Sequence, residues 1–340
     1  MKRRLSGVFR RLCFRRPLVN KTPVIFLLGP TASGKTELAV ELVRRLPLEI
    51  ISVDSALVYR GLDIGTGKPK PDILAKAPHR LIDIRDPAQA YSVAEFINDA
   101  RRAITGIENN GRIPLLVGGT GLYFRALCDG LAPMPNANPA VRARLAGEAE
   151  KWGWSALHRR LAQVDPQAAA RIHPNDPQRI QRALEVYELT NRPMTALLSS
   201  HSGDTLDHPV IRLILEPTDR LALQERIAAR FHEMLKSGLV AEVQRLRARG
   251  NLHRDLPSMR AVGYRQVWNY LMGQVNYPDM VATAIAATRQ LARRQLTWLR
   301  SETGEAARFS CQDTGISDKI LHYLSKNTLW KGNVRGVTMP

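Results

Sequence analysis

Eight consecutive residues near the N-terminus have the types and the spacing of a loop that binds phosphates. They follow a short apolar run, precede a segment with helical periodicity and fit the pattern G-x-x-x-x-G-K-[ST]: Gly29, Pro30, Thr31, Ala32, Ser33, Gly34, Lys35 and Thr36. In such a P-loop the backbone N–H groups point at the phosphates, the lysine reaches the terminal ones, and the Ser/Thr hydroxyl can ligate Mg²⁺. Nucleoside triphosphates are the usual ligands, but any other diphosphate presents the same oxygens.

A carboxylate is predicted to lie beside this loop. Asp54 ends the apolar run that starts at Glu49, and ligands of open α/β folds bind at the carboxyl ends of the strands. There Asp54 could ligate Mg²⁺ or act as a general base on an incoming nucleophile. It could instead only cap the following segment, Ser55 to Leu57.

A cluster of glycines follows another apolar run. The sequence Gly118-Gly119-Thr120-Gly121 comes directly after Pro114–Val117. Close approach of the backbone to a ligand would explain these glycines, with the Thr120 hydroxyl offered to a phosphate. A tight turn from strand to helix would explain them equally well.

Strands that alternate with helices must position these three loops. Apolar runs predict strands, and 3.6-residue periodicity predicts helices at 36–46, 93–107 and 281–301, with a further helix that Asp219 caps and Gly238 stops. The predicted strands are Val24–Leu28, Glu49–Asp54, Arg80–Ile84, Pro114–Val117 and Val210–Leu215. This pattern is typical of an α/β fold in which helices flank a parallel sheet.

The composition changes along the chain predict four regions. Residues 1–22 form a basic arm, residues 23–130 and 205–302 form the core domain, and residues 131–204 form an inserted all-helical domain. In the insertion, Asn138, Asp165 and Asp176 each precede a proline, as a helix cap does. Residues 303–340 are predicted to be a loosely structured tail.

The net charge indicates a polyanionic partner. The chain has 50 Lys and Arg against 31 Asp and Glu, a net charge of +19, and without the arm it still carries +11. Such a surface attracts RNA or DNA phosphates, although solubility alone would also account for it. The arm is interpreted as a disordered extension of a cytoplasmic protein, with an organelle transit peptide as the alternative.

Two classes of protein are excluded by composition. Each apolar stretch is shorter than 18 residues, so no membrane-spanning helix is expected. Cys13, Cys128 and Cys311 are far apart and form no C-x-x-C pair, so neither a disulfide framework nor a cysteine-built zinc site is expected.

Eight motifs together resemble the tRNA dimethylallyltransferases, also called tRNA isopentenyltransferases, in their bacterial form. The resemblance extends from about Val24 to Arg300 and implies a P-loop NTPase-like sheet with a helical insertion that contacts tRNA. The motifs are at residues 29–36, 54–60, 63–69, 118–123, 173–179, 182–185, 262–266 and 288–295.

This resemblance implies a specific reaction. The loop would hold the diphosphate of dimethylallyl diphosphate, and the nucleophile would be the exocyclic amine of the adenosine 3′ of the anticodon. Asp54 would accept the proton, while Lys35, Thr36, Thr120 and Mg²⁺ would stabilise the departing diphosphate. Arg226 and Arg230, one helical turn apart on the helix predicted after Asp219, could reach the same diphosphate, although surface arginines at this spacing are also common. The tail has Cys311 and His322 but no pairable C-x-x-C, so we expect no zinc, and we expect a monomer.

The resemblance also implies which residues contact the anticodon stem-loop. A solvated basic surface is the alternative for each cluster alone. The implied tRNA contacts are Asp54, Ser55, Ala56, Leu57, Thr120, Arg142, Gln178, Arg179, Ile180, Gln181, Arg182, Arg260, Ala261, Val262, Gly263, Tyr264, Arg265, Arg289 and Arg293.

Three other functions fit parts of the sequence. A P-loop kinase or ATPase for a small molecule would use Asp54 or Asp83 as its Mg²⁺ carboxylate. A prenyltransferase acting on a free adenine nucleotide would need no long basic insertion. An RNA-binding protein regulated by nucleotide would show no catalytic loss when Asp54 is replaced.

Overall fold

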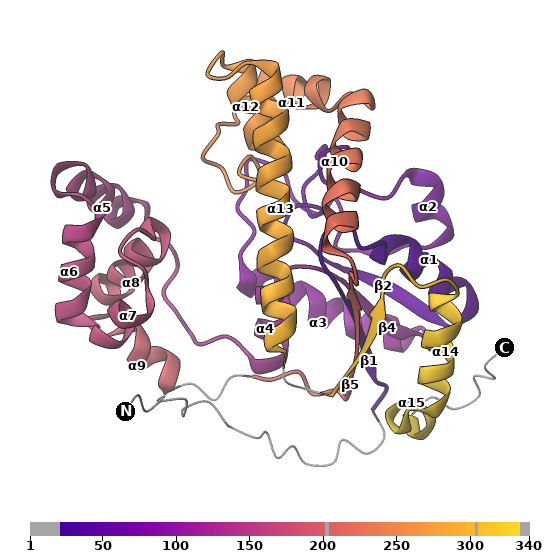
Figure 1. The fold of residues 1–340 in the computed structure, drawn as a ribbon. Helices are drawn as coiled ribbons and strands as arrows, with labels where there is room; N and C mark the ends of the chain where they lie inside the picture. The colour runs from indigo at the N-terminus through magenta and orange to yellow at the C-terminus, as the bar shows by residue number, and fades with distance from the viewer. Residues whose placement is uncertain (1–20, 201–203, 303–304, 334–340) are drawn as a thin grey trace, which may run out of the picture. The chain divides into compact units, whose positions relative to one another are not determined.

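The computed structural model describes residues 21–200, 204–302 and 305–333, so most of the predicted arm 1–22 lies outside the described residues. The chain divides into two compact units (Figure 1). One contains the chain up to Phe124 and from Asp207 onward, and the other is Arg125–Leu206. The predicted insertion, 131–204, lies within the second unit.

A parallel sheet forms the centre of the first unit. All its neighbouring strands pair in parallel, in the order β3-β2-β4-β1-β5-β6. The central strands are buried on both faces, which is why they read as continuous apolar runs. The strands are β1 (Val24–Leu28), β2 (Leu48–Val53), β3 (His79–Arg80), β4 (Ile113–Gly118), β5 (Val210–Glu216) and β6 (Ala306–Ser310).

Helices surround this sheet. Helix α3 begins at a capping box in which Ser92 and Glu95 exchange hydrogen bonds, and its apolar face packs on the sheet. The helices of this unit are α1 (Lys35–Arg45), α2 (Pro71–Lys76), α3 (Val93–Asn109), α10 (Arg220–Lys236), α11 (Leu239–Ala248), α12 (Tyr264–Leu271), α13 (Tyr277–Ser301), α14 (Ile316–Lys326) and α15 (Thr328–Asn333), and α4 (Gly121–Asp129) leads into the second unit.

The predicted strand Arg80–Ile84 is wrong beyond its first residue. Strand β3 ends at Arg80, because Leu81 and Asp83 have left-handed backbones with φ of 65° and 57°. An extended strand requires a negative φ. The alternating apolar pattern of this segment instead reflects a loop that packs against residues 57–60, where the Asp83 N–H donates to the Leu57 carbonyl oxygen at 3.2 Å.

The predicted loose tail at 303–340 is also wrong within the residues that the structure describes. Strand β6 extends the sheet beside β5, and α14 packs on the core through Ile320 and Leu324. Trp330 of α15 is buried in the same cluster. Strand β6 is five residues long and none of them is fully buried, so it does not read as an apolar run in the sequence.

The second unit is a small bundle of helices with its own core. Leu145, Leu161 and Leu184 are fully buried in it, whereas Trp152, the last residue of α5, is 65% exposed. The predicted caps Asn138, Asp165 and Asp176 all accept backbone N–H groups. Its helices are α5 (Pro139–Trp152), α6 (Trp154–Val164), α7 (Pro166–Arg171), α8 (Pro177–Thr190) and α9 (Met194–Ser199).

Candidate active site

The three loops that carry candidate chemistry lie at one edge of the sheet. The P-loop follows β1, Asp54 follows β2 and Thr120 follows β4, and these strands are neighbours. Glycines allow the loops to approach each other, since a Cβ on Gly118 would lie only 2.1 Å from the Val53 carbonyl oxygen. The prediction that the sheet brings these loops together is therefore confirmed.

Lys35 lies inside the P-loop, folded back onto the loop's own oxygens. Its Nζ donates to the Pro30 carbonyl oxygen at 2.5 Å and to Ser33 Oγ at 3.3 Å. The pKa of Lys35 is lowered to about 8, mainly by burial; the Asp54 carboxylate acts to raise it, and the charge of Arg230 acts to lower it. Burial and the neighbouring Arg230 charge both disfavour the charged form of Lys35, and a bound anion would stabilise that form.

Asp54 uses one of its two carboxylate oxygens for structure. Its Oδ1 accepts the backbone N–H groups of Ala56 at 2.8 Å and Leu57 at 3.3 Å. The capping role considered from the sequence is therefore present in the structure. These bonds do not occupy Oδ2, so the second oxygen can still accept a proton or a metal ion.

Gln295 joins two of the loops. Its side-chain oxygen accepts the Thr31 N–H at 2.8 Å and its amide donates to the Gly119 carbonyl oxygen at 3.1 Å. Three residues further along α13, Trp298 lies so close to Gly121 that a Cβ there would come within 2.2 Å of its ring. The sequence analysis placed Gln295 in the family motif 288–295 and missed this bridging role, because both of its partners are far away in the sequence.

Arg230 of α10 reaches toward the P-loop, as the sequence analysis considered. Its Nη2 donates to the Thr66 carbonyl oxygen at 3.4 Å, and its charge acts on Lys35. Arg226, one turn earlier, instead donates to Cys311 Sγ at 3.0 Å. Two positive side chains, Lys35 and Arg230, thus lie at the place where a diphosphate would accumulate negative charge.

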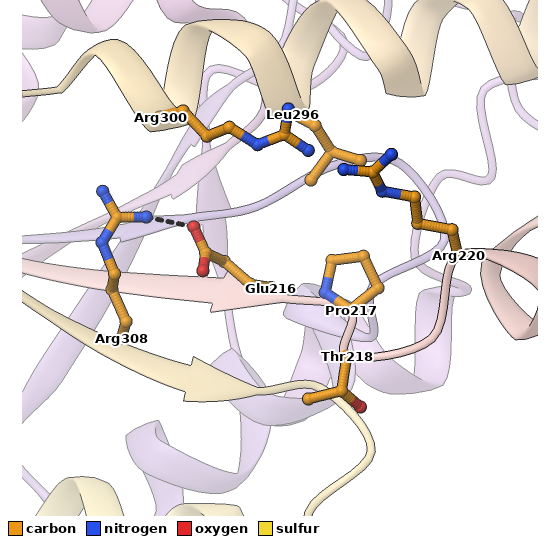
Figure 2. Close-up of a pocket in the computed structure, with 7 residues that line it drawn as sticks. All are labelled: Glu216, Pro217, Thr218, Arg220, Leu296, Arg300 and Arg308. Atoms are coloured by element: carbon orange, nitrogen blue, oxygen red, sulfur yellow. Dashed lines mark hydrogen bonds and ion pairs between the residues drawn. The ribbon is translucent and has the colours of Figure 1, made fainter.

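A second positive region lies at the carboxyl end of β5, next to β1. A cavity of about 400 Å³ is formed by the end of β5, the start of α10, the last turns of α13 and β6 (Figure 2). Arg308 pairs with Glu216 there. The cavity is lined by Glu216, Pro217, Thr218, Arg220, Leu296, Arg300 and Arg308.

The oxygen atoms at this edge suit Mg²⁺. The Thr36 hydroxyl and the Asp54 carboxylate are hard oxygen donors, and Mg²⁺ prefers such donors together with water and substrate phosphates. Among the described residues, no group of three or more His, Cys, Asp or Glu side chains is arranged to hold a metal by itself. Thr36 and Asp54 therefore fit as two of the oxygen donors to such an ion.

Comparison with known proteins decides the family. The sequence model of the family described as IPP transferase matches residues 57–302. A tRNA dimethylallyltransferase of Thioalkalivibrio sulfidiphilus (strain HL-EbGR7) is 63% identical over 282 residues, which make up 83% of this chain and 88% of that protein. The chain belongs to this family. The resemblance drawn from the motifs is confirmed, and the chain is a prenyl-transferring enzyme rather than a small-molecule kinase.

Solved structures of tRNA isopentenyltransferases are similar to this chain. A full-length tRNA isopentenylpyrophosphate transferase from Bacillus halodurans is 37% identical and has a TM-score of 0.66, covering 92% of this chain and 98% of its own. A tRNA delta(2)-isopentenylpyrophosphate transferase from Staphylococcus epidermidis is 32% identical and has a TM-score of 0.64, covering 90% and 99%. A eukaryotic dimethylallyltransferase acting on tRNA, 23% identical, has the same fold with a TM-score of 0.74, covering 94% and 87%.

The tRNA dimethylallyltransferase motifs expected to contact RNA differ in exposure. In the first unit, Arg260, Arg265, Arg289 and Arg293 are exposed, and Ser55 is exposed beside Asp54. Arg289 and Arg293 share one face of α13, because they are four residues apart. Within the described residues, no helix is long and apolar enough to cross a membrane.

Tyr264 does not face solvent as a side chain that contacts RNA would. It is fully buried at the start of α12, where its hydroxyl donates to Glu242 at 2.5 Å. The structure therefore corrects the expected side-chain contact, since Tyr264 must first leave the interior to touch a base. Its neighbours Ala261 and Val262 are half-buried, and Gly263 is buried with a φ of 93°.

In the second unit, the tRNA contacts expected on α8 are residues 178–182, and only the first two of these are exposed. Gln178 and Arg179 are exposed, but Ile180 is fully buried in the bundle core, so its side chain is not available to RNA. The Gln181 amide donates to the Arg142 carbonyl oxygen at 3.0 Å. Arg142 and Arg182, both expected to bind tRNA, are half-buried, and both form ion pairs with one carboxylate of this unit.

That carboxylate is Glu185, which is fully buried. It accepts from Arg142 at 2.8 and 3.0 Å, from Arg182 at 2.7 Å and from the Asn138 N–H at 2.8 Å. Burial acts to raise the pKa of Glu185, but these hydrogen bonds hold it below its usual value. The arginines are thereby fixed in place, and each keeps some exposed surface.

Proposed function

We propose that this protein transfers the dimethylallyl group of dimethylallyl diphosphate to the exocyclic amine of the adenosine 3′ of the anticodon in tRNA. The observation that carries the proposal is the placement of the P-loop lysine and Asp54 at one sheet edge, in a chain that belongs to the tRNA dimethylallyltransferase family. A phosphate loop next to a carboxylate suits a reaction in which a diphosphate leaves while an amine attacks.

The chain's own residues cover both ends of this substitution. The adenosine nitrogen attacks the allylic carbon, the bond from that carbon to the diphosphate oxygen breaks, and the amine's proton passes to Asp54 Oδ2. Lys35, Thr120 and Arg230 stabilise the charge that develops on the leaving diphosphate. Because an allylic carbon carries positive charge well, stabilising the leaving group is the larger part of the task.

Thr36 would hold Mg²⁺ together with the diphosphate oxygens. When bound there, the ion adds positive charge next to the departing diphosphate. The helical unit and the exposed arginines of α12 and α13 bind the anticodon stem-loop. The target adenosine leaves its stack, and residues 54–57 hold it in the site, as enzymes that modify bases require.

Incubation of the purified protein with Mg²⁺, labelled dimethylallyl diphosphate and unmodified tRNA tests the function. Digestion of the RNA should yield an isopentenylated adenosine from the position next to the anticodon, with one diphosphate released for each label. Free AMP should not compete as acceptor. ATP consumption without label in the RNA would contradict the proposal.

The lowered pKa of Lys35 predicts a pH dependence of dimethylallyl diphosphate binding. Below pH 8 the ammonium is charged and attracts the diphosphate, and above it the free enzyme loses this charge. We expect the apparent KM to rise about tenfold for each pH unit above the pKa, because the charged fraction falls tenfold. Initial rates from pH 7 to 9.5 measure this.

A Lys35→Arg variant is the control for that measurement. Guanidinium stays charged throughout this range, so its KM for dimethylallyl diphosphate should be nearly constant with pH even if it is higher. A wild-type KM that does not change between pH 7 and 9.5 would contradict the assignment of this titration to Lys35.

The α13 arginines are expected to bind RNA through phosphates. The double variant Arg289→Ala/Arg293→Ala should weaken tRNA binding and lower the slope of log K against log salt by about 0.7–0.9 for each phosphate that is no longer neutralised. Filter binding at 50–300 mM KCl measures the slope. Arg44→Ala, an exposed arginine of α1 near the opposite edge of the sheet, is the matched control, and an equal effect there would mean a nonspecific charge effect.

A further inference from the structure

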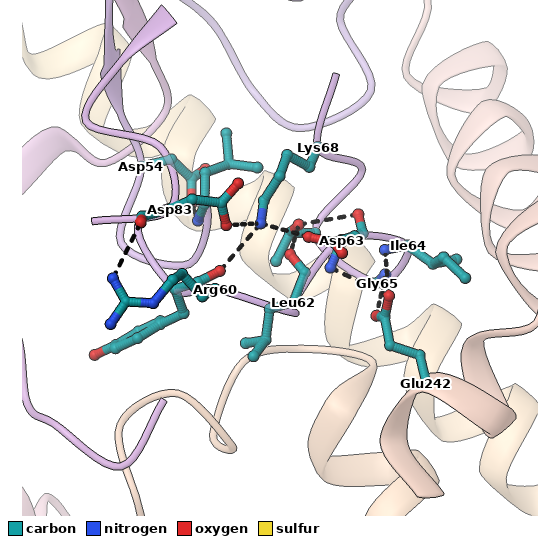
Figure 3. A network of polar contacts seen from close by, with 12 residues as sticks. Asp54, Arg60, Leu62, Asp63, Ile64, Gly65, Lys68, Asp83 and Glu242 are labelled. Atoms are coloured by element: carbon teal, nitrogen blue, oxygen red, sulfur yellow. Dashed lines mark hydrogen bonds and ion pairs between the residues drawn. The ribbon is translucent and has the colours of Figure 1, made fainter. Parts of the chain in front are cut away.

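Glu242 of α11 is a buried carboxylate that the proposed reaction does not use. It is 3% exposed. Its Oε2 accepts the N–H groups of Asp63 at 3.2 Å and Ile64 at 2.9 Å, and its Oε1 accepts the Gly65 N–H at 3.3 Å (Figure 3). Three consecutive backbone donors from one loop therefore converge on one side chain.

Tyr264 completes this arrangement. Its hydroxyl donates to Glu242 Oε1 at 2.5 Å, and burial together with this carboxylate raises the pKa of Tyr264 well above its usual value. The ring also lies against the loop, since a Cβ on Gly65 would come within 2.5 Å of it. An ionised carboxylate has room for about four hydrogen bonds, so Glu242 is fully satisfied by these four donors.

The loop that Glu242 holds is the one that contacts Arg230. Arg230 donates to the Thr66 carbonyl oxygen at 3.4 Å, and a Cβ on Gly67 would lie 1.9 Å from Arg230 Nη2. Gly67 has a φ of 65°, so the backbone here is turned in a way that other residues rarely adopt. The loop backbone therefore forms the wall against which the Arg230 guanidinium rests.

A second set of bonds closes the other end of the same loop. Lys68, whose side chain is 5% exposed, pairs with Asp63 at 2.5 Å and with Asp83, and it donates to the Tyr59 carbonyl oxygen at 3.1 Å (Figure 3). Tyr59 belongs to the segment that starts at Asp54. The loop from Leu62 to Lys68 thus connects the two ends of the proposed reaction, the base and the arginine at the leaving group.

We propose that Glu242 is a positioning residue that fixes the loop Leu62–Lys68 and, through it, directs Arg230 at the diphosphate. The proposal rests on the proposed function, in which Arg230 contacts that diphosphate. This role needs both carboxylate oxygens of Glu242 as acceptors, because a side-chain amide has a single acceptor oxygen and would turn an NH₂ donor toward the loop's N–H groups. A donor left without a partner in a buried place is costly.

The test is a double-mutant cycle between Glu242→Gln and Arg230→Ala. Glu242→Gln alone should weaken binding of dimethylallyl diphosphate about tenfold, seen as a higher KM, with a smaller change in kcat and no change in tRNA affinity. In the Arg230→Ala background the same substitution should have almost no further effect, because the residue through which Glu242 acts is gone. Additive effects in the double variant would overturn the proposal.

Further variants separate positioning from loss of fold. Tyr264→Phe keeps the ring and the charge of Glu242 but removes one donor, so it should shift the same KM in the same direction by a smaller factor. Glu233→Gln, an exposed glutamate on α10, should change neither constant. A Tyr264→Phe protein with normal thermal unfolding and an unchanged KM would also count against the proposal.

Inorganic diphosphate makes the cycle independent of turnover. Its affinity for the wild type, the two single variants and the double variant, measured by titration calorimetry, should show the same non-additive pattern as the KM values. If the wild type transfers no label to tRNA but the calorimetric cycle is non-additive, the proposed function has failed and the role of Glu242 stands. If transfer occurs and the calorimetric cycle is additive, the role of Glu242 is wrong.

Discussion

Replacing Asp54 with asparagine should lower kcat for dimethylallyl transfer by about 10²- to 10⁴-fold, the usual contribution of a general base. Asparagine keeps the oxygen that accepts the Ala56 and Leu57 N–H groups, so the loop should retain its shape. The affinities for tRNA and for inorganic diphosphate should change less than about threefold, because the amide is nearly isosteric with the carboxylate. Single-turnover transfer of labelled dimethylallyl groups measures the loss, and Asp72→Asn, an exposed residue of α2, is the control.

Asp54→Ala separates the chemistry of Asp54 from its capping bonds. Alanine removes both, so it should lower kcat as asparagine does and also lower thermal stability, since a lost cap costs about 1 kcal/mol. If asparagine keeps the activity and only alanine loses it, then Asp54 shapes the loop and another group takes the proton.

Replacing Lys35 with alanine should reduce kcat/KM for dimethylallyl diphosphate by at least about 10²-fold, because one preorganised donor to developing negative charge contributes that much. The ammonium lies within the P-loop with Arg230 as its cationic neighbour. We assign two cationic side chains to the leaving diphosphate, Lys35 and Arg230. The Lys35→Ala variant keeps only Arg230 of these two. Steady-state rates at saturating tRNA measure the loss.

Two further properties identify a loss of this kind in the Lys35→Ala variant. Its rate should no longer depend on pH around 8, because the titrating group is absent. Its thermal stability should not fall, since burying a lysine whose pKa is lowered costs the folded state energy. Lys76→Ala, exposed on α2, should behave as wild type, and a variant at Lys35 with unchanged kcat/KM would remove the P-loop from the proposed reaction.

Local sequence patterns predicted most of the strands and loops that position the proposed catalytic residues. The P-loop, Asp54 and Thr120 each follow a buried apolar run, and runs of that kind are central parallel strands, so their shared edge could be inferred. Their caps and glycines are also local signals. These features depend on residues that are close together in the sequence, which is why a single sequence reveals them.

Features that depend on distant partners could not be predicted in this way. Glu242 is a single glutamate in an amphipathic helix, and only the fold brings it to a loop 177 to 179 residues earlier. Gln295 lies 264 residues from the P-loop residue it contacts. The segment Arg80–Ile84 alternates like a strand, but Leu81 and Asp83 take left-handed backbones that its neighbours in the fold impose.

The last strand of the sheet gives the protein a particular order of assembly during synthesis. Every residue proposed to act on either substrate precedes β6, and β5 has no partner on one side until β6 pairs with it. Translation proceeds from the N-terminus, so a nascent chain can hold the whole active site while β5 is still an open edge. An open strand edge attracts other chains. A message cut short after α13 would therefore yield a protein with all of its chemical groups and a strong tendency to aggregate.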